Sequence, residues 1–120
     1  MKRDYEYIVL GLGGFGSAAA YWLSRRAGGE VLGLEQFELG HAMGSSHGRS
    51  RIVRKAYPDP FYTEIMQEGY PMWAELQSES GREVLHECGL MYFGPADAQN
   101  VRTMIAGLTS LSVPYGEYWQ

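Results

Sequence analysis

The chain has 120 residues, of which 45% are hydrophobic and 13% aromatic, and its formal net charge is -4 at pH 7. This composition predicts a packed core rather than a disordered chain, and the net negative charge gives no support to nucleic-acid binding. The single cysteine excludes an internal disulfide, and no apolar run approaches the ~20 residues of a membrane span, so we expect a cytoplasmic protein with no membrane partner.

The first 35 residues predict a strand, a glycine turn, a helix and a second strand. The run YEYIVL, residues 5–10, is rich in aromatic and β-branched residues, which is typical of a strand buried on both faces. The alanine-rich run from Ser17 favours a helix that ends at Gly28 and Gly29. Residues 30–35, EVLGLE, form a second apolar run closed by an acid. This order predicts a βαβ unit with parallel strands.

The glycine turn carries the GxGxxG spacing at Gly11, Gly13 and Gly16. Gly11 allows a tight turn, Gly13 lets the backbone approach a pyrophosphate, and Gly16 lets the helix pack close to the strand. The helix N-terminus offers unsatisfied N–H groups to phosphates. Glu35 stands where a carboxylate binds ribose hydroxyls and disfavours a 2′-phosphate. The pattern predicts binding of FAD or NAD rather than NADP, and it leaves open which of the two.

A dense basic segment follows the second strand. Residues 44–57, GSSHGRSRIVRKAY, hold four Arg or Lys side chains in a chain that is otherwise mildly acidic. Taken alone, such charges belong to a solvated loop, and His47 alone would be a surface histidine. The long polar loop lacks the immediate return to a further βα unit that many NAD enzymes have, which disfavours an NAD-dependent dehydrogenase.

At this segment the sequence resembles the FAD-dependent amine and amino-acid oxidases of the monomeric sarcosine oxidase and pipecolate oxidase group. The resemblance rests on GLGGFGSAAAYWL, LEQF and above all GSSHGRSRIVRKAY, and continues through FYTEIMQEGYPMWAELQSESG and CGLMYFG up to about Pro95. It implies an α/β fold. Residues 1–85 would form the N-terminal βαβ part of a Rossmann-like FAD-binding domain, and residues 86–120 the start of an α+β substrate domain.

The resemblance also implies roles for single residues. His47 and Arg51 would lie near the flavin ring as catalytic candidates, since a fixed cation stabilises charge that develops there. Arg54 would bind the substrate carboxylate, because a guanidinium matches it with two parallel hydrogen bonds. No metal is expected. The full set of expected FAD-binding residues is Gly11, Gly13, Gly14, Phe15, Gly16, Glu35, Gln36, Ser45, Ser46, His47, Ser50 and Arg51.

The remaining residues are predicted as scaffold. Asp59 as N-cap, Pro60 at the first position and Gly81 as a stop frame a helix, which Pro71 is expected to kink or split. Its apolar stripe is predicted to be core and consists of Phe61, Ile65, Met66, Met72, Trp73 and Leu76.

Two further elements are expected after this helix. Residues 83–94, EVLHECGLMYFG, predict one or two short strands, with Cys88 as a small buried hydrophobe. Residues 96–111 predict an amphipathic helix.

The resemblance implies that the chain is the N-terminal portion of a longer flavoprotein oxidase. The parent is expected to oxidise the C–N bond of a secondary amine or imino acid, with dioxygen as acceptor and hydrogen peroxide as product. The alternatives are an NAD-dependent dehydrogenase and a non-catalytic dinucleotide-binding module. The 120-residue chain alone is expected to be inactive, to bind FAD weakly or not at all, and to self-associate through uncovered apolar surface.

Overall fold

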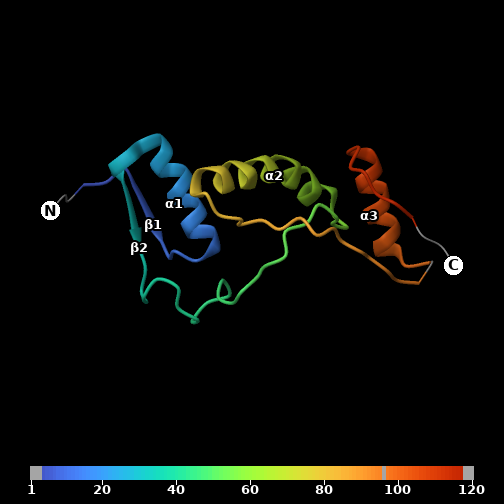
Figure 1. Cartoon of the computed structure of the whole chain (residues 1–120), viewed down its shortest axis with the longest axis horizontal. Helices are drawn as coiled ribbons and strands as arrows, with labels where there is room; N and C mark the ends of the chain where they lie inside the picture. The colour runs from blue at the N-terminus through green and yellow to red at the C-terminus, as the bar shows by residue number, and fades with distance from the viewer. Residues whose placement is uncertain (1–3, 96, 118–120) are drawn as a thin grey trace. The chain divides into compact units, whose positions relative to one another are not determined.

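The computed structural model describes residues 4–95 and 97–117 (Figure 1). Along the chain it forms two compact units, which divide between Arg51 and Ile52. The first unit holds β1 (Tyr7–Leu10), α1 (Gly14–Ala27), the short 3-10 turn η1 (Gly28–Glu30) and β2 (Val31–Leu34), and the second holds α2 (Pro60–Ser80) and α3 (Gln99–Ser110).

The predicted βαβ unit is confirmed in the first unit. The strands β1 and β2 pair in parallel, with Tyr7 opposite Val31 and Leu10 opposite Leu34. Glu6 N–H donates to the Glu30 carbonyl at 3.0 Å and extends this pairing by one residue. The helix α1 begins at Gly14, three residues earlier than the alanine-rich run indicated, so the glycines at 14 and 16 lie in its first turn.

The close packing of α1 against the end of β1 depends on Gly16. A Cβ atom at this position would overlap the Gly11 carbonyl oxygen and lie 3.5 Å from Cγ1 of Val9. Gly11 itself has a φ of +83°, in the left-handed region that residues with a Cβ rarely adopt. The chain can therefore leave β1, reverse and enter α1 within three residues only because both positions are glycine.

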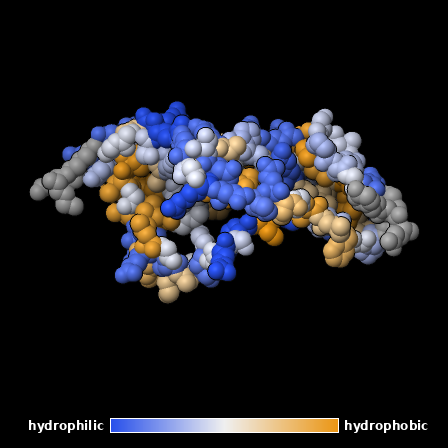
Figure 2. Space-filling view, in the orientation of Figure 1, coloured by the Kyte–Doolittle hydropathy of each residue, from blue (hydrophilic) through white to orange (hydrophobic). Residues whose placement is uncertain are grey.

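The two strands are less buried than the sequence predicted. Val9 points to α1, whereas Ile8 and Leu10 belong to the opposite face and are 58% and 78% exposed. Figure 2 shows apolar surface gathered over the part of the chain that holds the strands. The expectation of burial on both faces is wrong for the described residues, because α1 covers one face of the sheet only.

In the second unit, the predicted ends of α2 are confirmed. The Asp59 carboxylate accepts a hydrogen bond from Phe61 N–H at 3.0 Å, and Gly81 ends the helix with a φ of +63°. Of the kink or split expected at Pro71, the split is wrong, since α2 runs unbroken from Pro60 to Ser80, and the kink stays a prediction.

The predicted core stripe of α2 is only partly buried. Phe61, Ile65 and Met72 are 58%, 47% and 41% exposed. The described buried apolar side chains lie instead on α3, where Met104 and Leu108 are 3% and 7% exposed. Among the described residues no further layer covers this helix pair, so half of the α2 stripe is exposed, and Met66, Trp73 and Leu76 are partly buried.

The strands expected at residues 83–94 do not form in the described chain, where this segment has no regular secondary structure. A strand needs a neighbour to satisfy its backbone, and the only described strands, β1 and β2, pair with each other. Cys88 is exposed, so its predicted burial is wrong as well. The helix expected at residues 96–111 is confirmed as α3, over a shorter range.

We expect Gly16→Ala to lower the free energy of unfolding by about 1–3 kcal/mol or more, because the added methyl group overlaps backbone rather than a movable side chain. Urea denaturation measures the change. Gly29→Ala is the matched control, since its Cβ meets no atom within 4 Å and should change stability by about 0.5 kcal/mol or less. Equal stability of the two variants would contradict this packing argument.

Candidate functional site

A groove of about 640 Å³ lies in the first unit, between the glycine turn and the loop that follows β2. Its lining includes six of the residues expected to bind a cofactor, which are Gly13, Gly14, Glu35, Ser45, Ser46 and His47. It also includes residues that the sequence did not single out, among them Leu12, Ser17, Phe37, Leu39, His41 and Met43. Gly11, Phe15, Gly16, Gln36, Ser50 and Arg51 were expected at the cofactor but are not part of this lining.

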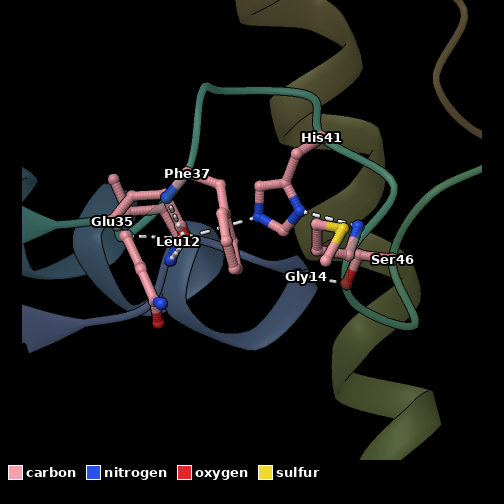
Figure 3. Close-up of polar contacts among 8 residues, drawn as sticks. Leu12, Gly14, Glu35, Phe37, His41 and Ser46 are labelled. Atoms are coloured by element: carbon pink, nitrogen blue, oxygen red, sulfur yellow. Dashed lines mark hydrogen bonds and ion pairs between the residues drawn. The ribbon is translucent and has the colours of Figure 1, made fainter.

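The carboxylate of Glu35 holds one end of the groove together (Figure 3). Its Oε2 accepts a hydrogen bond from Leu12 N–H at 2.7 Å, across 23 residues of chain. Its Oε1 accepts from the backbone N–H groups of Gln36 at 2.8 Å and Phe37 at 3.2 Å. These bonds, the one from Leu12 first and that from Phe37 second, hold the pKa of Glu35 below its ordinary value of 4.5.

At the other end, the loop meets the N-terminus of α1. Gly14 N–H donates to the Ser46 Oγ at 2.8 Å, which Figure 3 marks with a dashed line. A Cβ atom on Gly13 would lie 3.1 Å from the same oxygen. The absence of side chains at Gly13 and Gly14 therefore lets the hydroxyl of Ser46 come within hydrogen-bonding distance of the helix N-terminus.

The loop residues expected near the flavin make their described bonds to the loop backbone. His47 Nδ1 lies 2.5 Å from the Gly44 carbonyl oxygen, so this nitrogen carries the proton. Arg51 donates from Nε and Nη2 to the Ser45 carbonyl, at 3.1 and 2.6 Å, and from Nη1 to the Ser50 carbonyl at 2.6 Å. The guanidinium thus links the two ends of the segment 45–50 by hydrogen bonds. The catalytic roles of His47 and Arg51 stay predictions.

Arg54, the expected substrate-binding residue, belongs to the second unit. Its guanidinium lies over the ring of Tyr57, 4.6 Å from the centroid, which is the geometry of a cation–π contact. The neighbouring backbone is anchored by Thr63, a fully buried residue whose hydroxyl donates to the Lys55 carbonyl at 2.7 Å. Arg54 therefore lies against the ring of Tyr57 next to a backbone that Thr63 anchors, and its role toward a substrate stays a prediction.

A parallel strand pair, joined through a glycine turn and a helix and closed by an acid, defines a dinucleotide-binding unit. Residues 6–119 match the family described as FAD dependent oxidoreductase, and the chain belongs to that family. This membership selects FAD from the two cofactors that the glycine motif left open.

The chain is similar to several curated oxidases. It is 41% identical over 114 residues to human peroxisomal sarcosine oxidase, covering 95% of this chain and 29% of the relative. It is 42% identical over 116 residues to monomeric sarcosine oxidase of Streptomyces avermitilis, covering 96% and 30%. It is 36% identical over 103 residues to N-methyl-L-tryptophan oxidase of Yersinia pestis, covering 82% and 28%. The chain thus spans less than a third of the length of these relatives.

Two properties of the described residues bear on metals and membranes. They contain no group of three or more His, Cys, Asp or Glu side chains that could hold a metal ion. No helix among them is both long and apolar enough to cross a membrane. Because the human relative is named as peroxisomal, the cytoplasmic location stays a prediction.

The lowered pKa of Glu35 predicts a specific pH dependence of stability. A carboxyl group whose pKa falls on folding stabilises the folded state above its unfolded value of 4.5, and this contribution is lost as the pH falls through the folded value. We therefore expect Glu35→Gln to be less stable than the wild type at neutral pH, with the difference closing in acid.

Urea denaturation at a series of pH values measures this effect. Glu38→Gln removes an equal charge from an exposed position in the same loop and serves as the control. A stability difference for Glu35→Gln that does not change with pH would contradict the assignment of these hydrogen bonds to the ionised carboxylate.

Proposed function

We propose that the chain is the N-terminal part of a longer FAD-dependent oxidase, which oxidises the C–N bond of a secondary amine or imino acid and produces hydrogen peroxide. Family membership and the names of the relatives support this proposal. The observation that carries it is the groove that joins the Glu35 carboxylate to the N-terminus of α1.

The N-terminal end of α1 suits the pyrophosphate of FAD. The first N–H groups of a helix lack partners within the helix and carry a partial positive charge, which favours phosphate. The Ser46 hydroxyl accepts from Gly14 N–H and keeps its own hydrogen for donation to a phosphate oxygen. Ser46 thus extends the donor set of the helix rather than blocking it.

The other end of the groove suits the adenosine ribose. Of the two carboxylate oxygens of Glu35, Oε1 accepts from two backbone N–H groups, whereas Oε2 accepts only from Leu12 in the described chain. A carboxylate oxygen can accept two hydrogen bonds, so Oε2 retains capacity for a ribose hydroxyl. The negative charge disfavours a 2′-phosphate at the same place.

FAD held between Glu35 and the N-terminus of α1 would supply the two-electron oxidation of the amine C–N bond, and dioxygen would take up the two electrons with two protons as hydrogen peroxide. The amine becomes an imine, which water hydrolyses. Arg54 binds the carboxylate of the substrate, and the ring of Tyr57 holds the guanidinium in place. Arg51 supplies a fixed positive charge and keeps the loop 45–50 ordered around it.

We expect the full-length protein that carries this chain to contain flavin and to release one peroxide for each N-methylated or cyclic amino acid consumed. Flavin absorbance and a coupled peroxide assay measure both. A protein without flavin whose turnover requires NAD would contradict the proposal, and one that binds FAD but oxidises no amine would be a non-catalytic member.

The Arg54→Lys variant separates substrate binding from cofactor binding. A lysine keeps the charge but loses the planar pair of donors, so KM for a carboxylated amine should rise about tenfold or more while the flavin content stays unchanged. Arg102→Lys, an exposed arginine of α3, is the control. An unchanged KM in Arg54→Lys would remove this residue from the substrate site.

A further inference from the structure

His41 lies in the loop after β2, beside the end of the groove that Glu35 occupies (Figure 3). Its Nε2 is 3.4 Å from Oε1 of Glu35, and the two side chains are only 22% and 13% exposed. Its ring meets that of Phe37 edge to face, with the centroids 4.9 Å apart. His41 N–H also donates to the Glu38 carbonyl at 3.1 Å, which closes a turn in the loop.

The hydrogen bond at its other nitrogen fixes the tautomer of His41. Met43 N–H donates to Nδ1 at 3.0 Å, so Nδ1 is an acceptor and carries no proton. In the neutral ring the proton is then on Nε2, the nitrogen that faces Glu35. Oε1 already accepts from the N–H groups of Gln36 and Phe37, and 3.4 Å exceeds the length of an ordinary N–H···O bond. The approach of Nε2–H to Oε1 is therefore an electrostatic contact that adds to these two hydrogen bonds and is weaker than either.

The contacts of His41 connect two parts of the groove. Glu35 accepts a hydrogen bond from Leu12 in the glycine turn, and His41 accepts one from Met43 in the 41–48 loop. A neighbouring side chain fixes the orientation of a carboxylate only when its own position is restrained. The imidazole of His41 is restrained by the hydrogen bond at Nδ1 and by its contact with the Phe37 ring. His41 has the contacts that a positioning residue needs.

We infer that His41 positions the Glu35 carboxylate, and through it the glycine turn at Leu12, by an electrostatic contact of Nε2–H with Oε1 while Nδ1 holds the loop at Met43. The consequence for FAD affinity rests on the proposed function, in which Glu35 binds the ribose. The positioning itself does not depend on the cofactor, so the two can be tested apart.

The first test is amide hydrogen exchange at Leu12, measured by NMR on the chain without cofactor. His41→Ala should speed this exchange by about threefold to tenfold, because the carboxylate that accepts from Leu12 loses a neighbour that fixes it. His41→Gln keeps an N–H donor near the place of Nε2 and should restore slow exchange. His41→Asn keeps an acceptor near the place of Nδ1 but no donor for Glu35, and should behave like alanine.

A long-range proton–nitrogen spectrum of the His41 ring provides a second readout, which should identify Nε2 as the protonated nitrogen. His86→Ala is the matched control, since His86 lies 2.9 Å from Glu83 in an exposed pair, 77% and 68% exposed, in the second unit. A proton on Nδ1, or equal exchange at Leu12 in the wild type and His41→Ala, would overturn the inference, as would His41→Asn restoring slow exchange while His41→Gln does not.

The affinity of the full-length protein for FAD is measured in the same three variants. His41→Ala and His41→Asn should weaken it by about threefold to tenfold, and His41→Gln should retain it. If exchange at Leu12 follows the predicted order but FAD affinity does not, the positioning stands and the assignment of Glu35 to the ribose fails.

Discussion

The carboxylate of Glu35 accepts backbone hydrogen bonds from the turn after β1 and from the loop after β2, and the candidate site depends on this constraint. Leu12 N–H lies in the glycine turn after β1, whereas the N–H groups of Gln36 and Phe37 follow β2. One side chain therefore fixes two loops that are adjacent in space but distant in sequence. A neutral or shorter residue at this position would leave these donors without their charged acceptor.

This constraint gives the groove two chemically different ends. The acid lies at one end, and at the other the N-terminus of α1 meets the hydroxyl of Ser46. Gly16 makes the arrangement possible, since the helix could not start so close to β1 with a side chain there. In the proposed function the acid accepts from the ribose and the helix N-terminus donates to phosphate, and both ends are tied to the short turn between β1 and α1.

Local signals in the sequence predicted local structure well. Asp59 and Gly81 marked the ends of α2 because capping depends on neighbouring residues, and the glycine spacing marked the turn before α1. The strands expected at residues 83–94 and the burial of Cys88 were wrong because both depend on other layers of structure. His41 was missed because a single histidine in a polar loop has no pattern, and only the folded loop brings it to Glu35.

The central claim is that Glu35 receives the ribose of the dinucleotide, and competition between two nucleotides tests it most directly. ADP and its 2′-phosphorylated form are allowed to displace FAD from the full-length protein and from its Glu35→Gln variant. The account predicts that the wild type prefers ADP and that the preference falls about tenfold or more in the variant, because the repulsion between carboxylate and phosphate is removed. An unchanged preference would contradict the account, since the ribose would then lie away from Glu35.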